Sequence, residues 1–518
     1  MQLPSIRPAA VTAALALAAC AQRTAPSPPP GGVSVHSTVS ASGPAAAMLD
    51  PIISRIFALD LAPGMAVAVV RDTEVIYLKG FGYADLEARR PVTPETGFYI
   101  ASTTKAFTAL AAALLARDGT LDLDAPVSRY LPALRLAPPL APDSITLRML
   151  LSHTHGIGGD GPVVFRTAYS GDFTTEQLIA LVAEHPPAPD GRNYRYGNIG
   201  YNVASLAMDA ATGTPWKDVL ERRIFEPLDM RGTSGYVSRI PAEQLAMPYA
   251  AEAEGYIRLQ YAKGDESMHA AGGLVSTAAD LARWLLANIN DGQVDGQRVF
   301  PAEAMRDVHR QQASFRQASR GFTRFGYALG WNLTTYGSDT LLEHGGGFPG
   351  FATSIALLPA RRIGVAVVVN ENRLGGVLPD LVARYVYDKL AGRANVDSAM
   401  ADTIASFARL AAQRRQAIGA DRARRAARPQ TLPHPLVAYA GAYENPAYGR
   451  MEWSVASERL EVRMGRMRSV AEVFDASKNQ LRVELQPSVG EVITFQFEGG
   501  TAAALTYAER TYRRMGAP

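Results

Sequence analysis

Two apolar hairpins, far apart in the chain, limit the possible folds more than any other feature of this sequence. The first joins residues 64–70 to 75–78 across a tight turn, and the second joins residues 351–358 to 363–369 across Pro359. Nearly every position in these four segments is apolar, which predicts strands that are buried on both faces. A sheet that contains both hairpins therefore needs a layer of other elements on each side.

Helical patterns lie between the hairpins and can supply those layers. They cover residues 102–118, residues 174–184, which begin with a Thr174/Gln177 capping box, and residues 198–212. We therefore predict a fold of the α/β class in its broad sense, which includes α+β folds. Helices flank a mixed sheet, and a mostly helical region is inserted into it.

The last part of the chain has a different pattern. Residues 398–427 are rich in Ala and Arg with helical spacing, and Pro429 and Pro433 end this run. Short alternating segments follow, as in a small antiparallel β-barrel. We interpret the Arg-rich helix as a solvated linker, with contact to membrane headgroups as the alternative. The predicted domains are a main domain over residues 48–395, a linker helix over 396–430 and a small β-barrel over 431–518.

The N-terminal residues have the order of an export signal, in which Arg7 is followed by an apolar Ala/Leu stretch. This stretch ends in Leu17-Ala18-Ala19-Cys20, which resembles the bacterial lipobox, where cleavage precedes a cysteine that carries diacylglycerol. Cys20 is the only cysteine, so neither an intramolecular disulfide nor a cysteine zinc site can form. We predict a lipoprotein signal peptide over residues 1–20 and a disordered, Pro/Ser/Gly-rich tether over 21–47.

The lengths of the apolar runs and the net charge limit the possible partners. No later apolar run reaches the roughly 20 residues that a membrane span needs. We therefore expect a protein of the bacterial cell envelope that a lipid anchors to the membrane and that faces the periplasm. The net charge of +3 over 518 residues gives no electrostatic case for nucleic acid as a partner. The expected partner is a small-molecule or peptide substrate.

The strongest candidate for chemistry is Ser102-Thr103-Thr104-Lys105. A serine hydroxyl becomes a useful nucleophile when a base removes its proton, and residues three apart on a helix share a face. Only six of the 52 basic residues are lysines, and of these only Lys105 has a serine three positions before it. Because a desolvated lysine can lose its proton whereas an arginine cannot, this pattern favours Lys105 as a base. A lysine that only extends from a core helix is the alternative.

Two further motifs follow in a set order. Tyr196-Gly197-Asn198 precedes a predicted helix, and His344-Gly345-Gly346 directly precedes the second hairpin. With the flanking stretches at residues 150–156 and 271–280, the three motifs resemble the serine β-lactamases, the penicillin-binding DD-peptidases and related esterases, with class C β-lactamases as the most similar branch. The resemblance covers about residues 50–390, and residues 439–449 resemble the small β-barrel that many members carry.

The resemblance implies an acyl-enzyme on Ser102, with the proton work shared between Lys105 and Tyr196. It implies that Lys105 lowers the phenolic pKa of Tyr196, which then acts as a base and returns the proton to the leaving group. The backbone N–H groups of Ser102 and Gly347 are implied as the oxyanion hole. The implied substrate-binding residues are Asn198, His344, Gly346 and Gly347.

No cofactor and no metal is expected. His153 and His155 are close enough in sequence to suggest a metal site, but the family places this segment at the end of a helix, which favours a structural turn.

His344 stands where the β-lactamase pattern has a lysine that faces the carboxylate of a penicillin. A histidine with its ordinary pKa of about 6.5 is mostly neutral at pH 7. We therefore expect neutral esters or amides, or peptides bound by their amino end, to be better substrates than penicillins. We also expect activity on anionic substrates to rise as the pH falls toward 6.

The motifs leave the substrate open. β-Lactamases, DD-carboxypeptidases, D-aminopeptidases and carboxylesterases share all three of them. A penicillin-type sensor that acylates without turnover and a scaffold without catalysis are the alternatives outside enzyme function, and the intact Ser102, Lys105 and Tyr196 argue against the scaffold.

Overall fold

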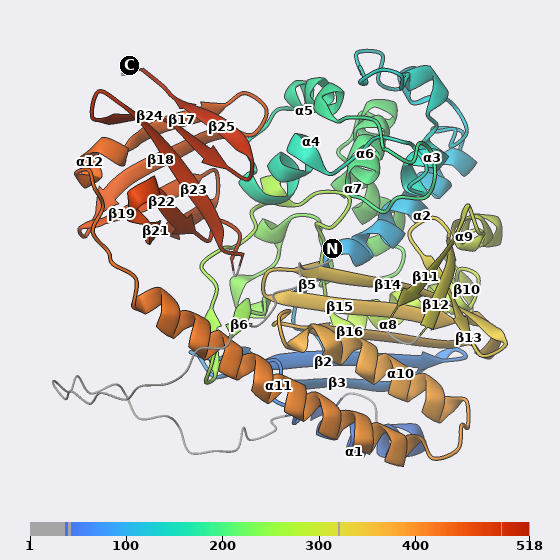
Figure 1. Ribbon diagram of the computed structural model, residues 1–518. Coiled ribbons are helices and arrows are strands. Elements are labelled where there is room, and N and C mark those ends of the chain that lie inside the picture. The colour runs from blue at the N-terminus through green and yellow to red at the C-terminus, as the bar shows by residue number, and fades with distance from the viewer. Residues whose placement is uncertain (1–36, 40–42, 320–321, 488, 517–518) are drawn as a thin grey trace, which may run out of the picture. The chain divides into compact units, whose positions relative to one another are not determined.

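The computed structural model describes residues 37–39, 43–319, 322–487 and 489–516. Within these residues ten strands form one large sheet, in the order β1-β3-β2-β16-β15-β14-β13-β12-β11, with β4 paired to β3 (Figure 1). The strands are β1 (Ser37–Val39), β2 (Gly64–Arg71), β3 (Glu74–Asp85), β4 (Arg90–Pro91), β11 (Ala313–Ser319), β12 (Phe322–Tyr327), β13 (Asn332–Tyr336), β14 (Asp339–Phe348), β15 (Phe351–Leu358) and β16 (Ile363–Val369).

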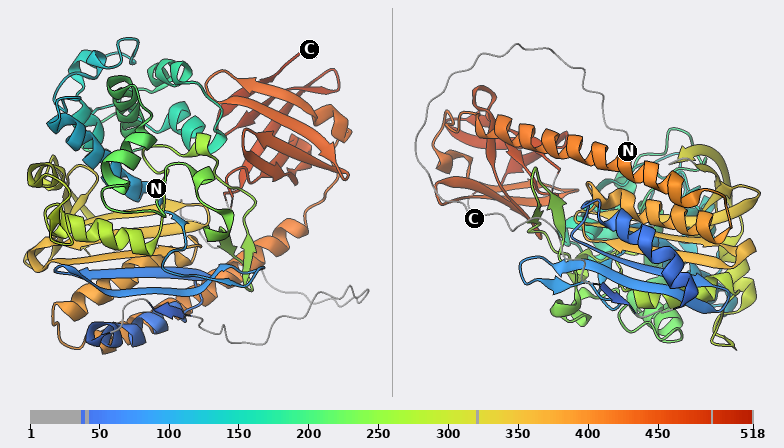
Figure 2. Two further views of the ribbon diagram at one scale, coloured as in Figure 1. Left: turned by 180° about the vertical axis from the view of Figure 1, so that it is seen from behind. Right: turned by 90° about the horizontal axis from the view of Figure 1, so that it is seen from below.

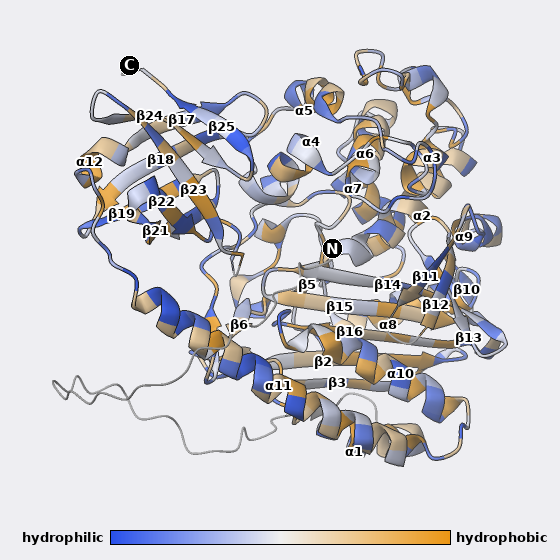
Figure 3. Ribbon diagram, viewed as in Figure 1, coloured by the Kyte–Doolittle hydropathy of each residue, from blue (hydrophilic) through white to orange (hydrophobic). Residues whose placement is uncertain are grey.

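Both predicted hairpins lie at the centre of this sheet, where β16 pairs with β2. Alternate residues of β2 enter two different cores: Ala66 and Ala68 belong to one, and Met65 and Val67 to the other. The helices α1 (Pro44–Phe57) and α10 (Leu378–Leu390) cover the second face, and α8 (Ala278–Ile289) packs on the first (Figure 2). Burial on both faces explains the continuous apolar runs, which Figure 3 shows along β2, β15 and β16.

The predicted fold class is confirmed, with one difference in detail. The sequence predicts a mixed sheet, whereas every strand pair of the large sheet that the structure describes is antiparallel. The reason is that most neighbours in this sheet are joined by short turns, and such connections make antiparallel pairs.

A helical region lies between β5 (Phe98–Tyr99) and α8, as predicted. The Thr174/Gln177 capping box is present at the start of α5, and Gly213 ends α6 in a left-handed conformation. The helices are α2 (Thr104–Arg117), α3 (Leu147–Leu151), α4 (Gly161–Phe165), α5 (Thr175–Leu181), α6 (Ile199–Thr212) and α7 (Trp216–Leu220), with α9 (Ala302–His309) after α8. Short strand pairs connect the region: β5 with β8 (Val275–Ser276), β6 (Tyr249–Ala251) with β7 (Tyr256–Arg258), and β9 (Gln293–Val294) with β10 (Gln297–Arg298).

The predicted tether is too long at its C-terminal end. Residues Ser37–Val39 pair with β3, and α1 begins at Pro44, where a proline is tolerated because the first turn needs no N–H from it. Leu49 and Ile53 of α1 are buried, so this segment packs on the domain. The predicted signal peptide and Cys20 lie outside the described residues. In the described part of the chain, no helix combines the length and the apolarity that crossing a membrane requires.

The linker helix α11 (Val396–Ala426) is mostly exposed, with many hydrophilic positions in Figure 3. It is nevertheless fastened to the main domain. The Arg415 guanidinium donates to the backbone carbonyls of Asp60, Glu252 and Gly255 at 2.8–2.9 Å. The arginines of this helix thus hold it in place, beyond the solvated role that its composition predicts.

A second sheet follows the linker, with α12 (Leu436–Tyr439) before it. Within the described residues its nine strands run in the order β20-β19-β18-β17-β25-β24-β23-β22-β21, and its two end strands adjoin in the chain, so the barrel is nearly closed. The strands are β17 (Gly441–Asn445), β18 (Gly449–Ala456), β19 (Arg459–Met464), β20 (Met467–Val470), β21 (Glu472–Asp475), β22 (Gln480–Val483), β23 (Glu491–Glu498), β24 (Thr501–Tyr507) and β25 (Arg510–Arg514).

Candidate active site

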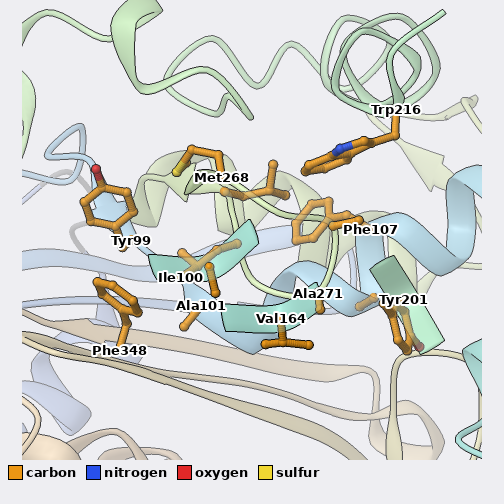
Figure 4. Packing of buried hydrophobic residues seen from close by; sticks show 14 of the residues in the cluster. Tyr99, Ile100, Ala101, Phe107, Val164, Tyr201, Trp216, Met268, Ala271 and Phe348 are labelled. Atoms are coloured by element: carbon orange, nitrogen blue, oxygen red, sulfur yellow. The ribbon is translucent and has the colours of Figure 1, made fainter. Parts of the chain in front are cut away.

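Ser102 lies at the point where the chain enters α2. A short 3-10 turn, Ala101–Thr103, precedes the helix, and Ala101 adopts a left-handed backbone conformation with φ of 47°. This conformation is strained for a residue with a side chain, and such strain is often found at functional sites. The apolar packing around the turn, which includes Ile100, Ala101 and Ala271, is drawn in Figure 4.

Lys105 lies one helical turn after Ser102 and is 0% exposed. Its Nζ donates to Ser102 Oγ at 3.3 Å, to Asn198 Oδ1 at 2.8 Å and to the Ala271 carbonyl at 2.8 Å. Burial lowers the pKa of Lys105 to about 7, and the negative charge of Asp160 opposes that shift. A large fraction of this amine is therefore neutral near pH 7 and able to accept the Ser102 proton.

Tyr196 reaches the same serine. Its hydroxyl is hydrogen-bonded to the Ser102 side chain, and Lys105 Nζ lies 4.8 Å from the centre of its ring. Although 43% of Tyr196 is exposed, its hydroxyl end is desolvated, and this burial raises the phenolic pKa above its ordinary value. The implied lowering of this pKa is therefore wrong: Tyr196 stays protonated near neutral pH, and Lys105 is the group that titrates there.

Asn198 connects Lys105 to a residue that the motifs do not include. Its backbone N–H and its Nδ2 donate to the two carboxylate oxygens of Asp160, at 2.6 Å and 2.8 Å. Asp160 comes from a glycine-rich loop before α4, and a single acidic residue in such a loop carries no sequence signal that would distinguish it from a surface aspartate.

The third motif lies on β14, close to Ser102. β14 pairs with β13 only as far as Glu343, whereas residues 344–348 pair with β15 alone among the described strands. A Cβ atom on Gly346 would lie 2.2 Å from the Ile100 carbonyl oxygen, so only glycine lets this strand approach the turn before Ser102 so closely. The unpaired edge of β14, with the exposed Gly345 and Gly347, thus borders the nucleophile.

His344 is 2% exposed and points into the protein. Its Nδ1 is 2.8 Å from the Gly345 carbonyl, which can only accept, so Nδ1 carries the hydrogen and Nε2 accepts from the Tyr327 hydroxyl at 3.3 Å. Burial, together with the charge of Lys105, lowers the pKa of His344 to about 3. The predicted neutral histidine is confirmed, but the predicted rise in activity toward pH 6 is not expected, because this ring stays neutral there.

Arg324 is the other cation that acts on His344. Both oxygens of Glu343 bind its guanidinium, at 2.6 Å and 3.1 Å. Lys105 and Arg324 are thus the described cations whose charges lower the pKa of His344. Neither is free to bind a substrate carboxylate, because Lys105 is buried and Arg324 is bound by Glu343.

His153 and His155 follow the short helix α3, as expected for a turn. The His153 ring packs 4.7 Å from the ring centres of both Tyr196 and Tyr327, and in the described structure neither of its nitrogens has a hydrogen-bond partner. His155 Nδ1 accepts the Ile157 N–H at 3.0 Å. Both histidines therefore have structural roles in the segment after α3, which lies beside Tyr196.

Comparison with known proteins identifies relatives of this arrangement. A family model described as Beta-lactamase matches residues 53–387. An unguisins hydrolase of Aspergillus violaceofuscus is 28% identical over 477 residues, which cover 86% of this chain and 80% of the relative.

Solved structures share the fold. A penicillin-binding protein homologue of Pyrococcus abyssi has a TM-score of 0.58 and 24% identity, and the match covers 90% of this chain and 99% of the homologue. A D-amino acid amidase of Ochrobactrum anthropi has a TM-score of 0.55 and 26% identity, over 66% of this chain and 97% of the amidase.

Proposed function

The chain belongs to the beta-lactamase family of serine hydrolases, and on this premise we propose that it is a hydrolase that forms an acyl-enzyme on Ser102. The observation that carries the proposal is the Lys105 amine, which lies 3.3 Å from Ser102 Oγ and has a pKa of about 7. A base with a pKa near the operating pH is the most effective kind for removing a proton in the reaction.

The mechanism follows from the protonation states. Neutral Lys105 takes the Ser102 proton as Oγ attacks the substrate carbonyl, and the backbone N–H groups of Ser102 and Gly347 stabilise the oxyanion. The protonated Tyr196 hydroxyl donates to the leaving group and regains a proton from the Lys105 ammonium. Water then attacks the acyl-enzyme, and its proton passes through the same pair to Ser102.

The substrate class is proposed from the third motif. A penicillin or a D-Ala terminus presents a carboxylate, whose binding favours a free cation. Here His344 is neutral and buried, and Arg324 is bound by Glu343. These contacts support a neutral ester or amide as substrate over a β-lactam, and the likeness to a D-amino acid amidase is in line with an amide.

We test this function with three chromogenic substrates: a neutral p-nitrophenyl ester, an amino acid p-nitroanilide and a cephalosporin. Steady turnover of the ester or the anilide is expected, with the cephalosporin slower. Ser102→Ala should abolish turnover and covalent labelling by a fluorophosphonate, because a nucleophile has no partial substitute.

Ser276→Ala is the control, since Ser276 is a buried serine that pairs with Thr233 instead of a lysine. Labelling without turnover would instead identify a sensor that only acylates. Turnover that survives Ser102→Ala would overturn the assignment.

We also propose that the mature protein begins at Cys20 and is held at the cell-envelope membrane by lipid. The sequence supports this proposal through Leu17-Ala18-Ala19-Cys20.

A further inference from the structure

The orientation of the Asn198 amide is fixed from outside the three motifs. A carboxylate can only accept hydrogen bonds, so the oxygen of Asp160 that lies 2.8 Å from the amide must face Nδ2. The Asn198 Oδ1 atom then faces Lys105 Nζ at 2.8 Å. If the amide were turned over, its NH2 group would face the Lys105 amine, and its oxygen would face the carboxylate.

We propose that Asp160 is a positioning residue, which orients Asn198 so that its amide oxygen holds Lys105 Nζ against Ser102. This inference rests on the proposed function, because it concerns the base that activates Ser102. Asp160 acts through Asn198 and does not itself contact the serine or the lysine.

The local structure makes room for this contact. A Cβ atom at position 197 would lie 3.1 Å from Asp160 Oδ1, so the glycine of Tyr196-Gly197-Asn198 allows the carboxylate to approach the backbone. Gly161, directly after Asp160, has φ of 43°, and a Cβ there would lie 2.5 Å from the His185 ring. Glycine is thus required at position 161, and a side chain at position 197 would crowd the Asp160 carboxylate.

The helix start adds an electrostatic reason for a carboxylate. Asn198 directly precedes the first residue of α6, and its N–H donates to Asp160 Oδ1 at 2.6 Å. The N-terminus of a helix has free N–H groups and a partial positive charge, both of which favour an anion. Asp160 therefore holds both the N-terminus of α6 and the Asn198 side chain in place.

The charge of Asp160 also acts on the base. It raises the pKa of Lys105, against the larger lowering caused by burial. Removing this charge should therefore lower the pKa of Lys105 further. A residue that only stabilised the fold would lower the amount of folded protein without moving this pKa.

The experiment measures kcat and KM for a neutral p-nitrophenyl ester from pH 5 to 9 in wild type, Asp160→Asn, Asp160→Ala and Asp160→Glu. We expect kcat to fall about 10-fold to 100-fold in Asp160→Asn and Asp160→Ala with little change in KM, because a charge-assisted contact to the base assembly is lost. The acid limb of the kcat profile should move to lower pH in both. Asp160→Glu, which keeps the charge, should restore part of the rate and the position of the limb.

Asp280→Asn is the matched control. Asp280 also accepts a backbone N–H, from Gly232 at 2.8 Å, and a side-chain donor, Thr233 Oγ1 at 2.7 Å, but it has no contact with Asn198. This variant should lower the unfolding temperature by a similar amount and keep the wild-type acid limb.

If Asp160→Asn keeps both the wild-type kcat and the wild-type limb, the inference is overturned. If its kcat falls in proportion to the folded fraction and its limb does not move, Asp160 is structural only and the inference is overturned as well. Failure of the proposed function looks different, since turnover would then survive Ser102→Ala. If Asp160→Ala does not fold, the position of the acid limb of the kcat profile in Asp160→Asn decides whether the inference holds.

Discussion

At the scale of single residues, two buried lysines show why a lowered pKa alone does not identify a base. Burial lowers the pKa of Lys105 and of Lys263 to about 7 in each case. Lys263 Nζ donates to the carbonyls of Ala168 and Ser267 at 2.8 Å and 2.9 Å and lies 4.2 Å from the centre of the Phe348 ring. None of these described partners is a nucleophile. Lys105 differs in having the Ser102 hydroxyl among its partners, beside Asn198, and this serine turns a buried amine into a candidate catalyst.

The first prediction concerns the pH dependence of hydrolysis. Because neutral Lys105 is needed, kcat/KM for a neutral ester should rise with pH through a midpoint at about 7. Lys105→Met should lower the rate of fluorophosphonate labelling by about 100-fold or more.

Lys263→Met is the control for loss of a buried amine. It should reduce the unfolding temperature but leave the midpoint near pH 7. A midpoint that moves in Lys263→Met would show that the observed titration does not belong to Lys105.

The second prediction concerns His344, whose pKa of about 3 keeps its ring neutral throughout the working range. The ratio of kcat/KM for an anionic ester to that for its neutral analogue should stay constant from pH 8 to pH 6. The ratio is the useful measure, because titration of Lys105 affects both substrates equally and cancels. A ratio that climbs as the pH falls to 6 would mean that His344 becomes protonated and contacts the substrate.

At the scale of secondary-structure elements, the site depends on how closely β14 approaches the start of α2. The first half of β14 is held by strands on both sides, but residues 344–348 pair only with β15 among the described strands. The absence of a side chain at Gly346 lets this half lie against Ile100, directly before the Ala101–Thr103 turn. Strand and helix thus approach most closely at Gly346, and a small displacement there would move the Gly347 N–H, the proposed second oxyanion donor, away from Ser102.

The third prediction is that Gly346→Ala strongly reduces activity. Its methyl group would lie 2.2 Å from the Ile100 carbonyl oxygen, so β14 has to move. We expect a loss of stability of roughly 1–3 kcal/mol and a fall in kcat of about 100-fold, since small misplacements of catalytic groups have effects of this size. Both are measured on the purified variant, by denaturant unfolding and by ester hydrolysis.

Gly345→Ala is the matched control one residue away. A methyl group there meets only the Thr353 carbonyl oxygen, at an ordinary 3.7 Å, so the unfolding free energy should stay at the wild-type value. Equal behaviour of the two variants would contradict the close approach as the reason for Gly346.

At the scale of the whole molecule, the barrel contacts the part of the main domain that leads into the site. The Arg166 guanidinium, just after α4, donates to the carbonyls of Pro446 and Ala447 at 3.2 Å and 2.7 Å. The N–H of Arg466, in the turn after β19, donates to the Ser170 carbonyl at 3.1 Å. The barrel therefore packs on the segment that begins at Asp160.

The fourth prediction concerns attachment to the membrane. Expressed with its N-terminal signal in a Gram-negative host, the wild-type protein should sediment with membranes and dissolve only in detergent, whereas Cys20→Ala should appear in the soluble fraction. Immunoblots of the two fractions measure this, and mass spectrometry of the N-terminal peptide checks for a diacylglycerol group. Wild-type protein that is soluble and unmodified in the periplasmic fraction would refute the lipid anchor.

The sequence by itself determined the features that arise within one element. Continuous apolar runs predicted the central strands, because burial on both faces leaves no polar position. Gly213 and the Thr174/Gln177 box predicted helix ends, since caps are set by neighbouring residues. The approach of Lys105 to Ser102 was predictable for the same reason, because residues three apart share a helix face.

Only the tertiary structure decided what depends on distant segments and on the loss of water. Asp160 meets Asn198 through the packing of a loop on the start of α6, and no spacing in the chain expresses that contact. The pKa values of Tyr196 and His344 depart from expectation because burial outweighs the neighbouring groups that the motifs suggest. The pairing of β1 and the packing of α1 likewise depend on partners, β3 and α10, that lie elsewhere in the sequence.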